Sequence, residues 1–310
     1  MPVPYAHPVD VLRRFDGNLS LDEVTSDNPF GAPDVETIWA RIRAVSQDWD
    51  SKTGTPLREV RSGSPGAPRT YEHHDADRTD GFPLRVELDG DDIVPLDPEE
   101  GDVLEIRTGR DTWENITDQE GDDWVLLHES GDLKLFQLLV HRVWWEAPDE
   151  RYLRACYRYG ALGGDRERGG QTTLSSNATT DASTLSVTDA SRLPADGGVV
   201  YVVDPAATDA TAGEYVRVTD VDVEADELTV VRGQERTDAA SHDQGAFVHY
   251  CPKDVRDAVA AKTAEQLVEY DTSLEQVDGE NASVTAQSKV DSWSEEYQNK
   301  LAEYSSVRRM

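Results

Sequence analysis

Residues 152–160 read Tyr152-Leu153-Arg154-Ala155-Cys156-Tyr157-Arg158-Tyr159-Gly160, and the composition of the chain changes soon after them. Their aromatic and apolar side chains predict a strand that ends at Gly160, and the glycine pairs 163–164 and 169–170 predict a linker. Residues 171–250 are then dominated by Thr, Ser, Ala, Val and Asp, with almost no helical pattern. The glycine-rich residues after Tyr159 therefore separate a region of helix and sheet from a β module.

Upstream of this stretch, the sequence predicts one long helix and a small antiparallel sheet. The helix begins after Asp34, which can cap it, and ends before Gly54, and its apolar residues recur at helical spacing. Its two tryptophans, Trp39 and Trp49, are expected in a core rather than in a ligand site. Residues 57–80 show no period and predict a loop, whereas short alternating runs between Leu84 and Tyr159 predict the sheet. Residues 1–33 predict an N-terminal arm with one short helix.

Downstream, the sequence predicts a β module followed by helices. Five candidate strands, at 183–188, 199–203, 214–221, 228–231 and 246–250, predict a small barrel or sandwich. Pro252 and Asp254 then predict the start of a helix. Residues 278–291 are polar and predict a loop or a short extended hairpin, and Ser292 to Glu295 predict a capping box before a terminal helix.

These elements together predict an α+β fold in three parts. Residues 1–33 are the N-terminal arm, and residues 34–165 with 251–310 form a core of helices and a small antiparallel sheet. Residues 171–250 form an all-β barrel or sandwich domain that is inserted into this core.

The charge of the chain indicates a salty environment. Asp and Glu number 62 against 30 for Lys and Arg, which gives a net charge of −32, and only six of the cations are lysines. Such a chain repels itself in dilute buffer, but in molar salt the Debye length falls to about 3 Å and screens the repulsion. The acidic residues are spread from end to end, which argues against a nucleic-acid mimic. Direct duplex binding is also not expected, because neutralising the phosphates needs clustered Lys and Arg.

No motif in the sequence predicts catalysis, a cofactor or a resident metal. His73-His74-Asp75 with Asp77 comes nearest to a metal site, but adjacent residues of an extended segment point apart, so no metal is expected there. The acidic stretches Asp89–Asp92 and Asp220–Asp226 lack the full EF-hand pattern and predict salt-adapted surface. Two cysteines, Cys156 and Cys251, are either buried thiols or a disulfide. No apolar run is long enough to span a membrane, and the first residues do not form a secretory signal.

Three local patterns resemble the head–tail adaptor (connector) proteins of tailed bacteriophages and archaeal tailed viruses. The first is the helix ending Ser46-Gln47-Asp48-Trp49-Asp50-Ser51-Lys52-Thr53-Gly54 with Leu57-Arg58-Glu59-Val60 after it. The second is Tyr157-Arg158-Tyr159-Gly160 together with Pro252-Lys253-Asp254-Val255-Arg256-Asp257-Ala258, which the β module separates. The third is the ending, with Ala282 to Thr285 extended and a terminal helix from Trp293 to Arg309. The β module itself, through Leu228 to Thr237 and Ala239 to Ala246, resembles one found in structural proteins of tailed viruses.

This resemblance implies a non-enzymatic ring, usually dodecameric, at the head–tail junction (neck) of a virion made in the cytoplasm of its host. The acidity and the scarcity of lysine indicate that this host is a halophilic archaeon. Its partners are the portal protein, a stopper or tail-completion protein and further copies of itself, and viral DNA passes through its channel without specific binding. The portal contact is expected in the terminal helix, at Trp293, Tyr297, Leu301, Tyr304, Val307, Arg308 and Arg309. The alternative for this helix is packing on its own domain. The alternative for the whole chain is a tail or baseplate component whose β module binds host surface glycan.

Overall fold

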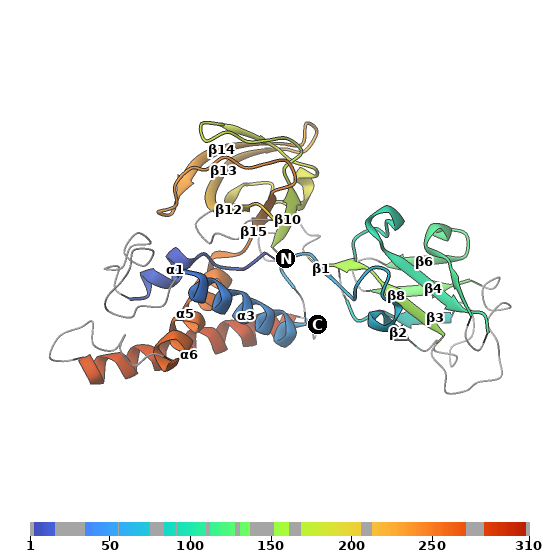
Figure 1. Ribbon diagram of the computed structural model, residues 1–310, viewed down its shortest axis with the longest axis horizontal. Helices are drawn as coiled ribbons and strands as arrows, with labels where there is room; N and C mark the ends of the chain where they lie inside the picture. The colour runs from blue at the N-terminus through green and yellow to red at the C-terminus, as the bar shows by residue number, and fades with distance from the viewer. Residues whose placement is uncertain are drawn as a thin grey trace. The chain divides into compact units, whose positions relative to one another are not determined.

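The computed structural model describes residues 3–15, 35–54, 56–74, 84–90, 92–109, 112–127, 131–136, 152–160, 169–205, 213–270 and 282–307 (Figure 1). The chain is an α+β protein with antiparallel sheets, as predicted. It divides into two compact units, one formed by Met1–Arg58 with Gly163–Met310 and the other by Glu59–Leu162.

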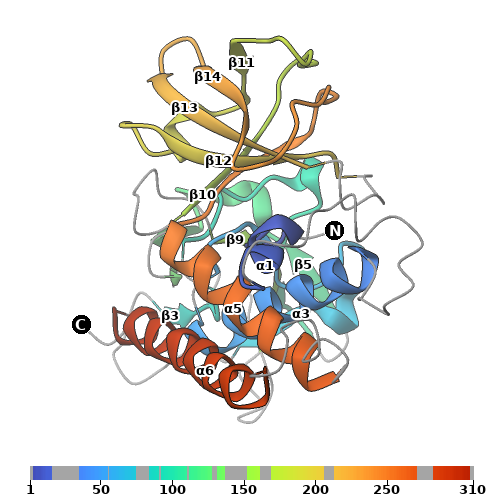
Figure 2. The same cartoon turned by 90° about the vertical axis from the view of Figure 1, so that its left-hand side faces the viewer.

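Four described helices belong to the first unit: α1 (Pro8–Arg13), α3 (Val35–Thr53), α5 (Lys253–Tyr270) and α6 (Ala282–Val307). The apolar positions predicted for α3 are buried, and α3 ends where Gly54 adopts φ +69°. Helix α5 packs against α1, α3 and α6 (Figure 2). Alanines 258, 260, 261 and 264 are fully buried on α5, so neighbouring helices can approach it closely from several sides. The helical core is therefore built around α5.

The described part of the predicted N-terminal arm belongs to this core. Val3, Tyr5, Val11 and Leu12 are buried in the same cluster as the helices. The imidazole of His7 accepts a hydrogen bond from the backbone N–H of Val9, and the carboxylate of Asp10 accepts one from His7 N–H at 3.0 Å. This reciprocal cap stabilises a helix of only six residues. Residues 3–15 are thus an integral layer rather than a free arm.

Helix α6 begins earlier than the sequence indicated. The loop or hairpin predicted for 278–291 is wrong from Ala282 onward, because α6 runs unbroken from Ala282 to Val307. Ser292 to Glu295, predicted as a capping box, lie inside this helix. No Gly or Pro interrupts residues 282–307, so the polar residues there do not stop the helix. The extended segment predicted at Ala282 to Thr285 is helical as well.

The first unit also contains one six-stranded antiparallel sheet. Its strands run in the order β10 (Gly170–Thr173), β15 (Phe247–Tyr250), β12 (Gly198–Val203), β13 (Glu214–Asp222), β14 (Glu227–Gln234) and β11 (Thr184–Ser186). Beyond the two edge strands, Leu174 and Val187 form a bridge, so the sheet curls back on itself as a half-barrel (Figure 1). A 3₁₀ turn, η4 (Ala190–Arg192), follows β11. The five predicted strands are confirmed, and β10 is an additional one.

Strand β12 is buried on both faces, and this joins the half-barrel to the helices. Val200 and Val202 belong to the apolar interior of the half-barrel, whereas Tyr201 and Val203 belong to the helical core. Tyr215 of β13 also faces the helical core. Successive residues of a strand point to opposite sides, so one strand supplies both cores.

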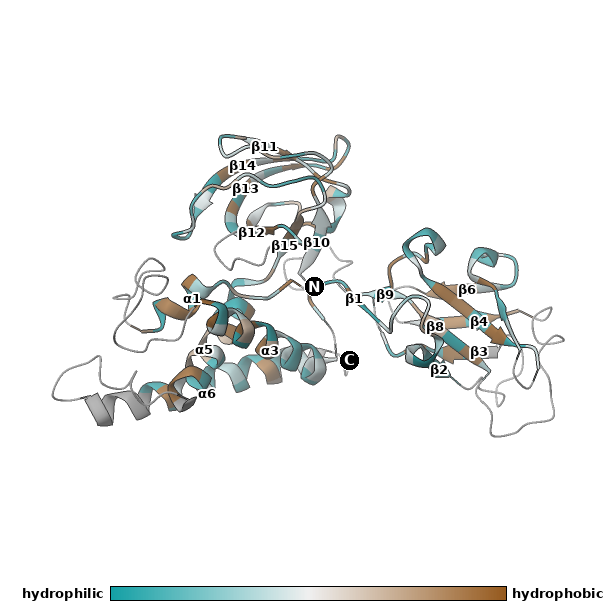
Figure 3. Ribbon diagram, viewed as in Figure 1, coloured by the Kyte–Doolittle hydropathy of each residue, from teal (hydrophilic) through white to brown (hydrophobic). Residues whose placement is uncertain are grey.

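The second unit contains two sheets and a short ribbon. One sheet has the order β2 (Glu72–His74), β8 (Leu153–Cys156), β4 (Val103–Arg107) and β5 (Trp113–Asn115), and the other has the order β3 (Leu84–Glu87), β7 (Asp132–Leu135) and β6 (Trp124–Leu127). The ribbon pairs β1 (Val60–Arg61) with β9 (Arg158–Tyr159). Three 3₁₀ turns are η1 (Pro68–Thr70), η2 (Pro98–Glu100) and η3 (Thr117–Gln119). The two sheets share one apolar cluster, and Figure 3 shows the hydrophobic residues concentrated on strands such as β4 and β6.

Two predictions differ from the structure, one about residues 57–80 and one about the division into domains. The loop predicted over 57–80 contains β1 and β2, which are too short to show a period and are held by their partners β9 and β8. The predicted domains also grouped the small sheet with the helices and set 171–250 apart. The compact units instead group the half-barrel with the helices, because β12 and β13 supply residues to the helical core.

Candidate functional site

The terminal helix α6 holds the residues predicted to bind a portal. Trp293 and Tyr297 are buried in the helical core, 8% and 0% exposed. The Trp293 ring lies edge-on to Phe15, with 5.6 Å between centroids, and Tyr297 lies edge-on to Trp49 at 5.7 Å. The Tyr297 hydroxyl donates a hydrogen bond to Asp48 Oδ2 at 3.0 Å. For these two residues the structure shows the alternative reading, packing on their own domain.

The remaining predicted portal-binding residues follow along α6. Leu301 and Tyr304 are half-buried against the core. Tyr304 packs edge-on against Trp49, with centroids 5.5 Å apart, and its hydroxyl donates to Asp254 Oδ1 at 3.2 Å. Val307 ends the helix, and Arg308 and Arg309 lie outside the described residues. The portal contact therefore stays a prediction, and the accessible side of α6 is a different set of residues.

That accessible side is polar and acidic. It consists of Asp291, Ser292, Glu295, Gln298, Asn299, Ala302 and Glu303. Ion pairs fix the helix in this orientation: Arg14 holds both carboxylate oxygens of Glu296 at 2.8 and 2.9 Å, and Lys300 lies 3.1 Å from Asp254. A partner that binds α6 as it stands here would meet acidic and amide groups instead of aromatic anchors.

Several residues of the pattern from Leu228 to Ala246 in the β module surround the carboxylate of Glu214. This carboxylate is fully buried and accepts hydrogen bonds from Arg232 Nη2 at 2.6 Å and from the backbone N–H groups of Gly233 and Ala240 at 2.6 and 3.1 Å. His242 Nε2 lies 3.4 Å from it. Burial alone would raise the pKa of Glu214, but hydrogen bonds from His242, Arg232 and the backbone outweigh it and lower the pKa to about 2. Glu214 is thus a structural anchor with its hydrogen-bonding capacity filled.

A second buried network involves the Pro252–Ala258 pattern. Arg256 pairs with Glu235 at 2.9 Å and lies over the Tyr215 ring, 4.5 Å from its centroid. The Tyr215 hydroxyl donates a hydrogen bond to the carboxylate of Asp10. Burial raises the pKa of Asp10, although Arg256 and the hydrogen bonds from Tyr215 and His7 oppose this. The network joins α1, α5 and the half-barrel, and its role is to hold these elements together.

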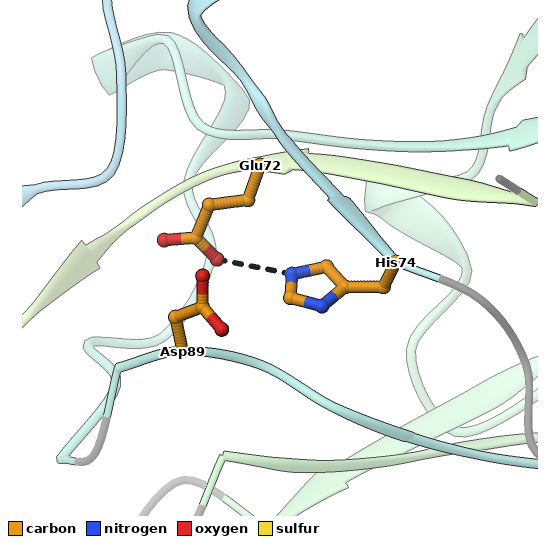
Figure 4. A group of neighbouring side chains, drawn as sticks. All are labelled: Glu72, His74 and Asp89. Atoms are coloured by element: carbon orange, nitrogen blue, oxygen red, sulfur yellow. Dashed lines mark hydrogen bonds and ion pairs between the residues drawn. The ribbon is translucent and has the colours of Figure 1, made fainter.

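Of His73, His74, Asp75 and Asp77, where the sequence predicted no metal, the structure describes only the two histidines, and these lie apart. His73 points away from His74 and lies edge-on to Trp113 with centroids 5.9 Å apart, as strand alternation predicted. Asp75 and Asp77 lie outside the described residues. His74 instead lies beside Glu72 and Asp89 (Figure 4).

The ligand atoms of Glu72, His74 and Asp89 all lie within 4.8 Å of one another. Glu72 and His74 are half-buried and Asp89 is exposed, so the group opens to solvent on one side. His74 Nε2 and Glu72 Oε2 are 3.1 Å apart. Sequence reasoning missed this combination, although it singled out His74 and the Asp89 loop separately. The available signal was the Glu72-x-His74 spacing, which places both side chains on one face of a strand.

Three other residues singled out from the sequence have structural roles. Asp222 caps the turn between β13 and β14 by accepting hydrogen bonds from the N–H groups of Glu224 and Ala225, both at 3.0 Å. Cys156 and Cys251 are both buried free thiols, one in each unit. Burial raises the pKa of each thiol, so both are protonated at neutral pH.

No family model and no curated protein matches the chain. Among the helices that the structure describes, none is long and apolar enough to cross a membrane.

Proposed function

We propose that the protein is a structural head–tail adaptor of a tailed virus, which forms a ring beneath the portal and joins the capsid vertex to a stopper or tail. In this proposal the chain has no catalytic role, and genome DNA passes through the ring without specific contacts. The ring leaves its host cell as part of the virion neck. The following observations support the proposal.

The observation that carries the proposal is that one side chain, Tyr304, links the three patterns on which the resemblance rests. It packs against Trp49 of the first pattern and donates a hydrogen bond to Asp254 of the second, and it belongs to the terminal helix of the third. About two hundred residues of chain separate Trp49 from Asp254. The three patterns therefore meet in one helical core, as the proposal expects.

A second juxtaposition supports the same proposal within residues 59–162. Val60, the last residue of the first pattern, pairs with Tyr159 of the second in the ribbon of β1 and β9. Ser62 reinforces this contact, because its N–H donates to the carbonyl of Tyr157 at 2.9 Å and its hydroxyl accepts from Tyr157 N–H at 3.1 Å. The strand that follows the first helix thus pairs with the strand that ends the sheet.

The surface of α6 suggests how such an adaptor would meet its portal. Because Trp293 and Tyr297 are used in the core, the proposed contact moves to the exposed face with Glu295, Gln298 and Ala302, and to the residues that follow Val307. An acidic face needs a basic or polar receptor, so we expect the facing surface of the portal to carry Lys or Arg.

The experiment is reconstitution of the full chain with the portal of the same virus, viewed by electron microscopy. We expect a ring with an open axis that binds the portal. The double variant Gln298→Arg with Ala302→Arg should abolish portal binding and leave the fold intact, because both side chains are exposed. Val223→Arg, an exposed change in the β13–β14 turn, is the matched control.

Two results would overturn the proposal. One is a monomeric chain that does not bind the portal under any salt condition. The other is binding to host surface glycans by a chain that does not bind the portal, which would establish the tail or baseplate alternative.

A further inference from the structure

We propose that Glu72, His74 and Asp89 bind one divalent transition-metal ion of the zinc class. The site lies wholly within residues 59–162 and does not depend on the adaptor function.

Strand geometry gathers two of the three ligands. Glu72 and His74 are alternate residues of β2, opposite Ala155 and Leu153 of β8, so both side chains leave the same face of the sheet. His73, between them, leaves the other face. Asp89 comes from the turn after β3, and Figure 4 shows its carboxylate directed toward Glu72 and His74. The three ligands therefore come from two separate elements of the unit.

The spacing of the ligand atoms suits a small ion. Bonds of 2.0–2.2 Å to zinc place tetrahedral ligand atoms about 3.3 Å apart. The pair His74 Nε2 and Glu72 Oε2 is already at 3.1 Å, and no pair in the group exceeds 4.8 Å. Asp89 is the exposed member of the group, so its side chain is the one free to adjust to an ion.

A buried tyrosine holds the first ligand in place. The Tyr157 hydroxyl donates to Glu72 Oε2 at 2.8 Å and accepts from the N–H of Gly90 at 2.9 Å. It therefore connects Glu72 to the residue that follows Asp89. Such outer hydrogen bonds orient metal ligands in proteins.

The charge on the side of the sheet that carries Glu72 and His74 also favours a cation. Two carboxylates meet there, and the arginine of the adjacent strand serves the opposite face: Arg154 pairs with Glu105 and lies over the Trp113 ring at 4.4 Å. Within the part of the chain that the structure describes, no Lys or Arg makes an ion pair with Glu72 or Asp89. The cluster carries two negative charges that a divalent ion would neutralise.

The ligand set selects the class of ion. Imidazole nitrogen and carboxylate oxygen are both ligands of Zn²⁺, and three protein ligands leave a fourth position for water. Ca²⁺ takes six to eight oxygen ligands, and imidazole is not among those it prefers.

The test is calorimetric titration of the metal-free full chain with Zn²⁺ alone and with Ca²⁺ alone at equal ionic strength. We expect one Zn²⁺ per chain and weaker binding of Ca²⁺. Asp89→Asn and His74→Ala should each weaken Zn²⁺ binding by more than tenfold, whereas His73→Ala, the neighbour on the opposite face, should bind like the native chain. Tyr157→Phe should weaken binding about 10–100-fold, as expected for an outer hydrogen bond. The absorption spectrum of bound Co²⁺ supplies an independent readout of the ligand set.

Several outcomes would overturn the site. These are a native chain that binds no Zn²⁺, tighter binding of Ca²⁺ than of Zn²⁺, and an equal loss of binding in His73→Ala and His74→Ala. Asp89 is exposed, so Asp89→Asn keeps the fold even where another variant does not. Unchanged binding in Asp89→Asn would exclude its role as a ligand.

Discussion

Arg256 lies over the ring of Tyr215, with its guanidinium carbon 4.5 Å from the ring centroid, and so connects the first turns of α5 to strand β13. The same guanidinium pairs with Glu235 of the loop after β14. A cation held between an aromatic face and a carboxylate has little freedom to move. This contact fixes the helical core against the half-barrel.

Replacement of Arg256 by Ala should therefore destabilise the first unit. Loss of one partner from a buried pair costs about 3–5 kcal/mol, because Glu235 and Asp10 lose their positive neighbour. Chemical denaturation, monitored by circular dichroism, measures the change in the free energy of unfolding. Arg217→Ala replaces an exposed arginine on β13, the strand of Tyr215, and should change the free energy of unfolding by less than about 0.5 kcal/mol. Equal effects of both variants would contradict the role given to Arg256.

Glu214 should make the stability of the half-barrel depend on acid. Its pKa is about 2 in the folded protein against an ordinary value of 4.5, so it stabilises the fold fully above about pH 4.5. This contribution is lost as the pH falls from 4.5 toward 2, because the unfolded chain takes up the proton first. In Glu214→Gln the free energy of unfolding should be lower at pH 7 and should fall less between pH 4.5 and 2. A native chain and a variant with the same pH profile would show that Glu214 does not have a lowered pKa.

The tryptophan of α6 should behave as a core residue. Trp293→Ala should cost about 3–5 kcal/mol, since a large buried aromatic side chain is removed beside Phe15. Glu295→Ala, two residues further on the exposed face, should change the free energy of unfolding by less than about 0.5 kcal/mol. Thermal unfolding of the purified variants measures both effects. A Trp293→Ala protein that is stable but does not bind the portal would show that Trp293 contacts the portal and is not a core residue.

Salt should stabilise the whole chain. With a net charge of −32, self-repulsion favours the unfolded state in dilute buffer, and raising KCl from 0.15 to 1 M shortens the Debye length from about 8 to about 3 Å. We expect the unfolding temperature to rise steadily across this range at constant pH. A flat or falling unfolding temperature would contradict a chain adapted to a salt-loaded cytoplasm.

The sequence predicts the elements with strong local patterns. Helix α3 follows from the spacing of Ile38, Trp39 and Ile42, and strands such as β13 follow from alternation between turns. Strand β10 was missed because Gly170-Gln171-Thr172-Thr173 is polar, and its conformation comes from pairing with β15. The first turns of α6 were missed because polar residues without Gly or Pro fit a loop and a helix equally well.

The sites depend on contacts that no local pattern contains. Alternation in β2 was enough to predict that His73 and His74 point apart, and the structure confirms this. The meeting of His74 with Asp89 depends on how the turn after β3 lies against β2, which the sequence alone does not specify. Likewise, the aromatic residues of α6 fit an interface and a core equally well. Only their burial against Trp49 and Phe15 assigns Trp293 and Tyr297 to the core.

The double burial of β12 has a consequence for shortening the chain. Removing residues 171–250 to obtain a minimal helical protein would take away Tyr201, Val203 and Tyr215, which form one wall of the helical core. The apolar sides of α1, α3 and α5 behind that wall would then face water, and the shortened chain would aggregate instead of folding. The β segment can therefore vary at its solvent-facing turns, but it cannot be exchanged as a cassette.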